Sequence, residues 1–400
     1  MKRRSLLGAM AVAPAATMAW GGAIAAPRRT AETTIADAEV FQVRVNRRGN
    51  WVIVRLKTAN GLTGVGDASH GGNDQKTIAY IRQLTDLLRG RTIFDVEWFR
   101  GAAAKLVRET NGVARSAASA LEQCLWDLIG KALGVPVYQL FGGKLRDRIP
   151  LYANINRSAD PRTPDGFAAM ARRAVDAGFT AVKLAPFDEM PKVPVEGADI
   201  AAGMNQGIAC AQAVRDAIGP KRDLLIDAHS RFTLRQGLEL LPRMEPLNLY
   251  WLEEVTPEED LADLAAINRA ARMPTAGGEM IFGIEAFYKY VQSGAVDTVM
   301  PDVKLCGGML ELKKISVIAE AAGLTVSPHG PASPIGNVAA AHVMAGVPNF
   351  TLLEFAFGEV PWRAELIDPL ENVAGGNLAL SDKPGLGIEL RERTLQKYAV

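Results

Sequence analysis

The pattern of apolar and polar positions divides the chain into two parts that meet near residue 149. In the first part, residues 34–66 alternate apolar and polar side chains, which predicts a small antiparallel meander. Residues 75–134 instead repeat their apolar positions at helical spacing. We therefore expect an N-terminal α+β domain that ends near Arg146.

From Ile149 onward, short apolar runs of strand character alternate with helical segments. This alternation predicts successive β/α units, and eight of them fit a closed barrel better than an open sheet. The expected strands are 149–154, 180–184, 223–227, 249–253, 274–278, 297–301, 324–328 and 351–354. The longest loop between them, 186–199, is expected to help shape a pocket.

Ionisable side chains follow seven of these strands in succession. Asp227, Glu253 and Glu279 recur at equal intervals of 26 residues (253 − 227 and 279 − 253), which matches one β/α unit each. The other four are Lys183, Asp302, His329 and Glu354. Because the carboxyl ends of parallel barrel strands lie on one face, we expect these side chains to converge there.

The three evenly spaced carboxylates predict a metal site. Left alone on one face of a barrel, they would repel one another strongly. An all-oxygen set of ligands favours a hard cation, and Mg²⁺ is the expected one.

Four stretches together resemble the enolase superfamily, in its mandelate racemase/muconate lactonizing enzyme-like branch. They are residues 120–127, 134–143, 251–254 and 301–308. The resemblance implies an α/β fold, with an N-terminal α+β capping domain over a modified TIM barrel of the (β/α)7β type. It also implies a homo-oligomer, either a dimer or an octamer.

This resemblance implies domain boundaries and roles for the strand-end residues. The capping domain would be 30–146, completed by about 366–400, with the catalytic barrel at 147–365. Asp227, Glu253 and Glu279 would bind Mg²⁺, and Asp302 with His329 would form a base dyad. We expect the adjacent Glu254 to point to the opposite face of its strand.

The implied chemistry is removal of a proton next to a carboxylate. Such a proton is very weakly acidic, so the enediolate that forms needs strong stabilisation, which a divalent cation supplies. Asp302 could fix the tautomer of His329 and raise its proton affinity. Lys183 is expected to contact the substrate carboxylate. Glu354 could donate a hydrogen bond to that carboxylate if it were protonated, or it could be structural.

Two further positions indicate which reaction of this branch the protein would catalyse. His229 lies two residues after Asp227 and so faces the same way, where it could protonate a departing β-hydroxyl or be a packed histidine. Many relatives in the branch carry a second lysine at the position of Ala185. Its absence disfavours racemisation, because a 1,1-proton transfer needs groups on both faces of the enediolate.

The run Asp227-Ala228-His229, with Arg231 close behind, is similar to the sugar-acid dehydratases of the branch, of the D-galactonate type. The expected substrate is a small carboxylate, an aldonate-like 2,3-dihydroxy acid that would give a 2-keto-3-deoxy acid. Arg231 and His70, the latter in a Gly-rich loop of the capping domain, are candidate substrate-binding residues. The alternatives are a racemase, epimerase or cycloisomerase, and a non-catalytic periplasmic binding protein.

The N-terminus and the composition add the cellular context. Residues 1–25 carry paired arginines, an apolar run and small residues, which predict a twin-arginine signal peptide, a periplasmic protein and no stable membrane span after cleavage. The net charge of +1 gives no electrostatic case for nucleic-acid binding. The three cysteines and His342 lie in apolar contexts and are expected to be packing residues.

Overall fold

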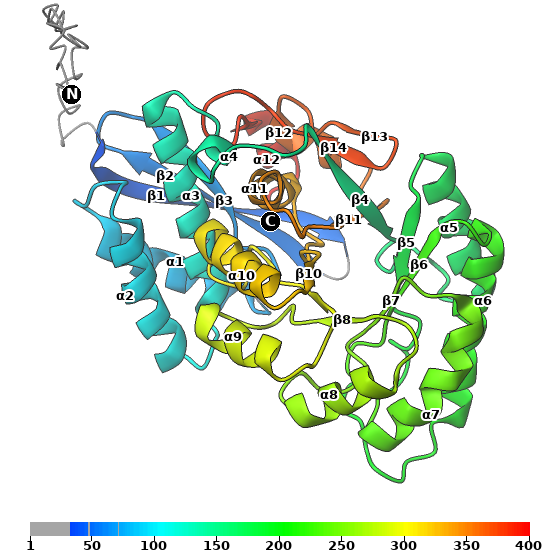
Figure 1. Ribbon diagram of the computed structural model, residues 1–400. Helices are drawn as coiled ribbons and strands as arrows, with labels where there is room; N and C mark the ends of the chain where they lie inside the picture. The colour runs from blue at the N-terminus through cyan, green and yellow to red at the C-terminus, as the bar shows by residue number, and fades with distance from the viewer. Residues whose placement is uncertain (1–32, 47–48, 71) are drawn as a thin grey trace, which may run out of the picture.

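The computed structural model describes residues 33–46, 49–70 and 72–400. The expected signal peptide lies outside these described residues. Two bodies are visible in Figure 1, a sheet with helices at the blue end of the colour range and a larger ring of strands and helices coloured green to orange. In the part of the chain that the structure describes, no helix is long and apolar enough to cross a membrane.

The first body is an antiparallel sheet covered by helices, as the sequence predicted. Its strands pair in the order β1 (Ile35–Asn46), β2 (Gly49–Thr58) and β3 (Thr63–Asp67). The helices are α1 (Asp74–Leu88), α2 (Val96–Glu109), α3 (Arg115–Leu133) and the short α4 (Val137–Leu140). Helix α3 crosses β3 at close range, since a Cβ at Gly66 would lie 2.1 Å from the carbonyl oxygen of Ala120. Glycine at this position therefore sets the distance between helix and sheet.

The second body is a parallel barrel. Its strands are β4 (Arg148–Asn154), β5 (Ala181–Leu184), β6 (Asp223–Asp227), β7 (Trp251–Glu253), β8 (Thr275–Gly277), β9 (Thr298–Val299), β10 (Thr325–Val326) and β11 (Leu353–Ala356). They pair in sequence order from β4 to β10, and β11 pairs with β4. A parallel bridge between Val326 and Phe350 joins β10 to the segment before β11 and closes the ring.

One helix follows each barrel strand except the last. These helices are α5 (Pro164–Asp176), α6 (Ala201–Ile218), α7 (Leu234–Met244), α8 (Leu261–Ala270), α9 (Ile284–Gln292), α10 (Met309–Ala321) and α11 (Pro334–Met344). A short 3₁₀ turn, η2 (Glu245–Leu247), extends α7. The described barrel is therefore of the (β/α)7β type, as expected. Strands β7 to β10 are shorter than predicted.

After β11 the chain returns to the first body. This segment contains η3 (Arg363–Leu366), β12 (Ile367–Asp368), β13 (Val373–Ala374), β14 (Asn377–Ala379), β15 (Glu389–Leu390) and α12 (Glu392–Lys397). Strand β14 extends the barrel by pairing with the start of β4. The last residues reach β1, where Arg44 N donates to Tyr398 O at 2.7 Å and Val400 N donates to Gln42 O at 3.1 Å. The C-terminal segment thus binds to both bodies.

Two carboxylates of the first body bind the N-termini of barrel helices. Glu122 of α3 accepts hydrogen bonds from the backbone N–H groups of Met309 and Leu310, at the start of α10. Asp67 of β3 accepts from the N–H and the hydroxyl of Ser333, the N-cap of α11. Helix N-termini carry unpaired N–H groups and partial positive charge, so these contacts hold the first body over the barrel mouth.

His342 is a packed histidine, as the sequence indicated. Its Nδ1 accepts from the Tyr138 N–H and its Nε2 donates to the Leu386 carbonyl, each at 3.2 Å. This pattern fits a neutral ring, and burial lowers the pKa of His342 to about 4. The three cysteines, Cys124, Cys210 and Cys306, are buried free thiols.

The buried neutral ring makes stability sensitive to acid. The pKa of His342 is about 4 in the folded protein and about 6.5 in the unfolded chain. As the pH falls from about 6.5 to about 4, His342 therefore binds a proton more readily in the unfolded chain, and the folded protein loses stability. Between pH 7 and 5.5 we expect the wild-type protein to lose about 1 kcal/mol more stability than His342→Gln, whose amide can keep both hydrogen bonds. Urea unfolding at the two pH values measures the difference, and equal losses in both proteins would contradict it.

Candidate active site

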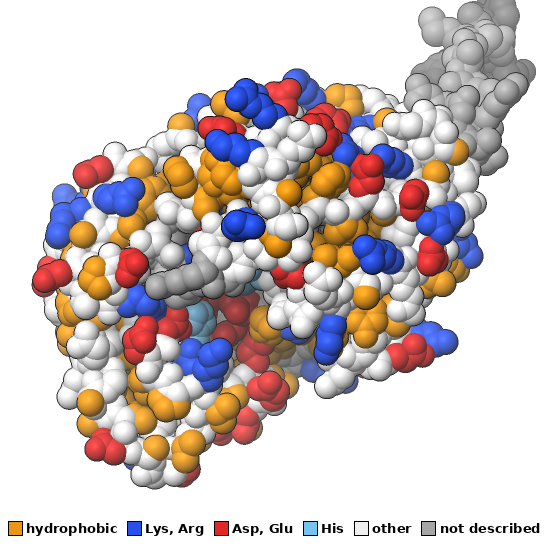
Figure 2. Space-filling model, turned by 180° about the vertical axis from the view of Figure 1, so that it is seen from behind, with side chains coloured by type: hydrophobic (Ala, Val, Ile, Leu, Met, Phe, Trp, Pro, Cys, Tyr) orange, Lys and Arg blue, Asp and Glu red, His pale blue; other side chains and the backbone are white. Residues whose placement is uncertain are grey.

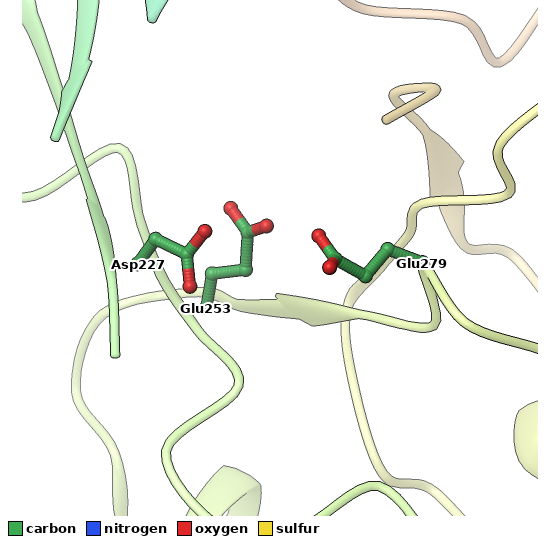
Figure 3. A group of neighbouring side chains, drawn as sticks. All are labelled: Asp227, Glu253 and Glu279. Carbon is green, nitrogen blue, oxygen red and sulfur yellow. The ribbon is translucent and has the colours of Figure 1, made fainter. Parts of the chain in front are cut away.

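Three carboxylates from consecutive barrel strands meet at the mouth of the barrel. Asp227 ends β6, Glu253 ends β7 and Glu279 lies two residues beyond β8. One oxygen from each lies within 4.8 Å of the others. Figure 3 shows Glu253 between Asp227 and Glu279, with the carboxylates of the two outer residues directed toward it. The predicted convergence of these side chains is therefore present.

Local backbone geometry aims these side chains inward. Gly278 takes a φ of 103°, which a residue with a side chain rarely adopts, and this turn brings Glu279 back over the barrel. After β6, His229 and Ser230 also have positive φ angles. Their backbone is held by two hydrogen bonds, from His229 N to the Asp227 carboxylate and from Ser230 N to Glu254 O. Strain of this kind is typical of functional sites.

Lys183 is buried in β5 beside the carboxylates. Its Nζ lies 2.8 Å from Glu253, 3.2 Å from Asp227 and 3.3 Å from Glu354. The ammonium group therefore cancels only part of the negative charge. Burial and the charge of Asp227 raise the pKa of Glu253, which means that the ionised trio is unfavourable without a further cation.

The residues present fit a hard divalent cation. All three side chains offer oxygen atoms, and the buried Oε2 atom of Glu279 makes no hydrogen bond, although Nε2 of His329 lies 3.1 Å from it. Glu254, the residue after β7, is buried beside Glu258, and burial together with the charge of Glu258 raises its pKa.

Asp302 and His329 form a hydrogen-bonded pair. The Nδ1 atom of His329 lies 2.7 Å from Oδ2 of Asp302, and the same oxygen accepts from the buried ammonium of Lys304. The Nε2 atom of His329 faces Glu279 at 3.1 Å. Burial opposes a charge on the ring, but the charges of Glu279 and Glu354, with the Asp302 hydrogen bond, raise the pKa of His329.

His229 belongs to a second pair, which the sequence did not indicate. Its Nδ1 makes a short contact with Oδ1 of Asp188, a residue of the loop after β5. Its Nε2 lies 3.1 Å from Asp227. Burial opposes a charge on the ring, but Asp227 and Asp188 together raise the pKa of His229 well above its usual range. In the order of the barrel strands, His229 after β6 and His329 after β10 lie on opposite walls.

Glu354 lies at the bottom of the site as an ionised carboxylate. It accepts hydrogen bonds from Asn154 at 2.5 Å and from Gly330 N at 2.9 Å. Burial disfavours the charge, but Lys183 and His329 outweigh it and lower the pKa of Glu354 to about 2. A protonated Glu354 that donates to a substrate is therefore disfavoured, because these neighbours all stabilise the anion.

Arg231 and His70 border the site from two sides. Arg231 is buried and its Nη2 lies 3.5 Å from Oδ1 of Asp188. His70, in the loop after β3, lies 3.1 Å from Arg157, which in turn binds Glu359. Figure 2 shows the hollow where acidic and histidine side chains are visible on this face. Contact of Arg231 or His70 with a substrate stays a prediction.

Comparison with known proteins fits this geometry. Residues 166–394 match the family described as "Enolase C-terminal domain-like", and residues 23–142 match "Mandelate racemase / muconate lactonizing enzyme, N-terminal domain". The chain belongs to the enolase superfamily, in its mandelate racemase/muconate lactonizing enzyme branch. The resemblance inferred from the sequence is thereby confirmed.

Relatives within this superfamily are similar over almost the whole chain. A D-xylonate dehydratase from Haloferax volcanii is 30% identical, with 92% of this chain and 90% of the relative covered. A D-galactonate dehydratase family member from Streptomyces bingchenggensis is 32% identical, with 91% and 93% covered. The solved structure of a mandelate racemase/muconate lactonizing enzyme-like protein from Rubrobacter xylanophilus has a TM-score of 0.85 at 32% identity, covering 92% of this chain and 98% of that one.

The resemblance to the branch implied a second lysine at position 185, and this chain has Ala185 there. Ala185 is buried, and its carbonyl accepts a hydrogen bond from Arg162 at 2.9 Å. In the described structure, the same loop brings Asp188 to His229 instead. Asp188 does not belong to any periodic pattern in the sequence. Its place in the longest barrel loop is the one feature of the sequence that could have indicated a role at the site. Lys304, two residues after Asp302, could have been found by the same-face argument.

The carboxylate trio generates a prediction about cations. At 100 times its dissociation constant, Mg²⁺ should raise the free energy of unfolding by about 2.7 kcal/mol, because it binds the folded trio and relieves its repulsion. Thermal unfolding with and without Mg²⁺ measures the shift. Asp227→Asn and Glu279→Gln should each remove most of it, whereas Glu320→Gln, on the exposed face of α10, should keep it. An equal shift in all proteins would place the ion elsewhere.

Proposed function

We propose that the protein is a Mg²⁺-dependent sugar-acid dehydratase that converts an aldonate-like 2,3-dihydroxy acid into a 2-keto-3-deoxy acid. The observation that carries this proposal is the pair of histidines, His329 and His229, on opposite walls of the carboxylate site. The dehydratases among the relatives support the same reaction class.

Asp227, Glu253 and Glu279 would hold the Mg²⁺ ion. When bound, the ion stabilises the negative charge that develops on the substrate carboxylate as the α-proton leaves. Lys183 adds a second positive charge at the same point, because its Nζ lies among these carboxylates.

His329 is placed to remove the α-proton. Its Nδ1 is bound to Asp302, so its Nε2 is the nitrogen that faces the site and can accept a proton. Asp302 holds the ring in this orientation and stabilises the imidazolium that forms. Glu354, an ionised group 3.7 Å from the same Nε2, adds to that stabilisation.

His229 is placed to complete the elimination from the opposite wall. Loss of the β-hydroxyl requires a proton on the departing oxygen, and Nε2 of His229 lies near Asp227, at the edge of the trio. The proton passes from His229 to the hydroxyl, the C–O bond breaks and water leaves. The resulting enol tautomerises to the 2-keto-3-deoxy acid, so the net change is the loss of one water molecule.

Turnover of a panel of sugar acids tests the proposal. The Mg²⁺-loaded protein is incubated with aldonates of defined stereochemistry, and 2-keto acids are measured. The expected result is a 2-keto-3-deoxy product from at least one of them. Deuterium incorporation from D₂O into recovered substrate, without any 2-keto acid, would instead support an epimerase, with His229 returning the proton from the opposite wall.

Substitution of the two histidines separates their roles. His329→Asn should abolish both the exchange of the α-proton in D₂O and the elimination of water, because no base remains. His229→Asn should slow elimination by about 10²- to 10⁴-fold while exchange continues, because proton removal is unaffected. Proton NMR and a 2-keto acid assay measure the two reactions. Exchange by His329→Asn at the wild-type rate would contradict the assignment of the base.

We also propose that the protein is exported to the periplasm by the twin-arginine route. The support is the sequence alone, where Arg3 and Arg4 precede an apolar stretch that continues to Ala26. Cell fractionation of the full chain tests this proposal. Retention of the mature-length protein in the cytoplasm would contradict it.

A further inference from the structure

The loop between β5 and α6 brings a carboxylate to the outer side of His229. Asp188 lies early in this loop, 13% exposed at the side chain, and its Oδ1 makes a short contact with Nδ1 of His229. The other ring nitrogen, Nε2, lies 3.1 Å from Asp227 at the edge of the trio. The imidazole is thus held between two carboxylates, one in the barrel wall and one in the loop.

Asp188 is itself fixed from behind by side chains that follow β4. Its Oδ2 accepts hydrogen bonds from Arg162 and from Asn156, each at 3.1 Å. Arg162 also donates to the carbonyl oxygens of Asn156 at 2.8 Å and Ala185 at 2.9 Å. These donors engage Oδ2, so Oδ1 is the oxygen directed at His229. The carboxylate has little freedom to turn away.

His229 needs such support because it is the more open of the two histidines. Its side chain is 31% exposed, whereas that of His329 is 13% exposed. A side chain with space on one side can change its rotamer, and a displacement of about 1 Å can cost about 10²-fold in rate. The contact with Asp188 holds the ring plane and leaves Nε2 toward the site.

We propose that Asp188, held by Arg162 and Asn156, is the positioning residue of His229 in the elimination step. Asp188 does not touch the reacting atoms. It keeps Nδ1 of His229 occupied and the ring oriented, so that Nε2 can deliver a proton to the departing hydroxyl. This inference rests on the proposed dehydratase function and adds a residue to it.

The test compares two reactions of the Mg²⁺-loaded enzyme with a sugar acid that the wild-type protein dehydrates. Asp188→Ala and Asp188→Asn should each lower kcat for elimination, at least tenfold for Asp188→Ala. Exchange of the α-proton in D₂O should continue at no less than half the wild-type rate, because His329 is untouched. The exchange rate also reports that each variant is folded and binds substrate, and Asp188→Asn decides the matter if Asp188→Ala does not fold.

Glu189→Gln is a matched control. Glu189 is the next residue in the loop, and it binds Arg162 from the solvent side at 3.0 Å with 71% of its side chain exposed. Its substitution removes a carboxylate partner of the same arginine without touching His229. Both elimination and exchange should stay at the wild-type rate.

A double-mutant cycle separates positioning from a general structural effect. In a His229→Asn background, adding Asp188→Ala should change the residual elimination rate by less than twofold, because the ring that Asp188 orients is gone. Three outcomes overturn the inference: an equal loss of exchange and elimination in both Asp188 variants, an unchanged elimination rate, or an undiminished effect in the His229→Asn background. Absence of dehydration by the wild-type protein on every sugar acid would instead overturn the proposed function.

Discussion

Repulsion among Asp227, Glu253 and Glu279 is the constraint on which the rest of the site depends. At a separation of at most 4.8 Å and an effective dielectric constant of about 20, each pair of full charges would repel by about 3 kcal/mol or more. The ammonium of Lys183, and the rings of His229 and His329 that lie 3.1 Å from Asp227 and Glu279, offset part of this repulsion. The barrel tolerates this arrangement because short strands fix the backbone from which each side chain extends, and the charge that is left over favours a cation.

The first body is held against the barrel by contacts that include two buried carboxylates, Glu122 and Asp67, each bound to the N-terminus of a barrel helix. These contacts connect α3 and β3 to helices α10 and α11, which follow the strands that supply Asp302 and His329. Docking of the first body and placement of Asp302 and His329 therefore involve the same part of the barrel.

The sequence predicted the barrel strands and the residues at their ends, because both follow a regular pattern along the chain. A strand in a parallel barrel is a short apolar run with a fixed direction, so the residue at its carboxyl end could be assigned to the site without knowing any contact. The position of Asp188 could not be predicted in this way, because it depends on contacts with Arg162 and Asn156 from another loop. The ionisation of Glu354 was missed for a related reason, since it depends on Lys183 and Gly330, which only the folded chain brings near.

His329 and His229 each contact an aspartate, and the two aspartates differ in which oxygen also binds a neighbouring cation. Oδ2 of Asp302 accepts from both Lys304 and His329, so part of its charge is already neutralised at the atom that meets the ring. In Asp188, by contrast, the strong donors Arg162 and Asn156 bind Oδ2, and Oδ1 is left to His229, with Arg231 more distant.

An imidazolium is therefore better supported at His229, and a neutral ring is more accessible at His329. An elimination needs this asymmetry, with a neutral base on one wall and a charged acid on the other. In this chain the difference comes from which oxygen of each aspartate the neighbouring cation binds.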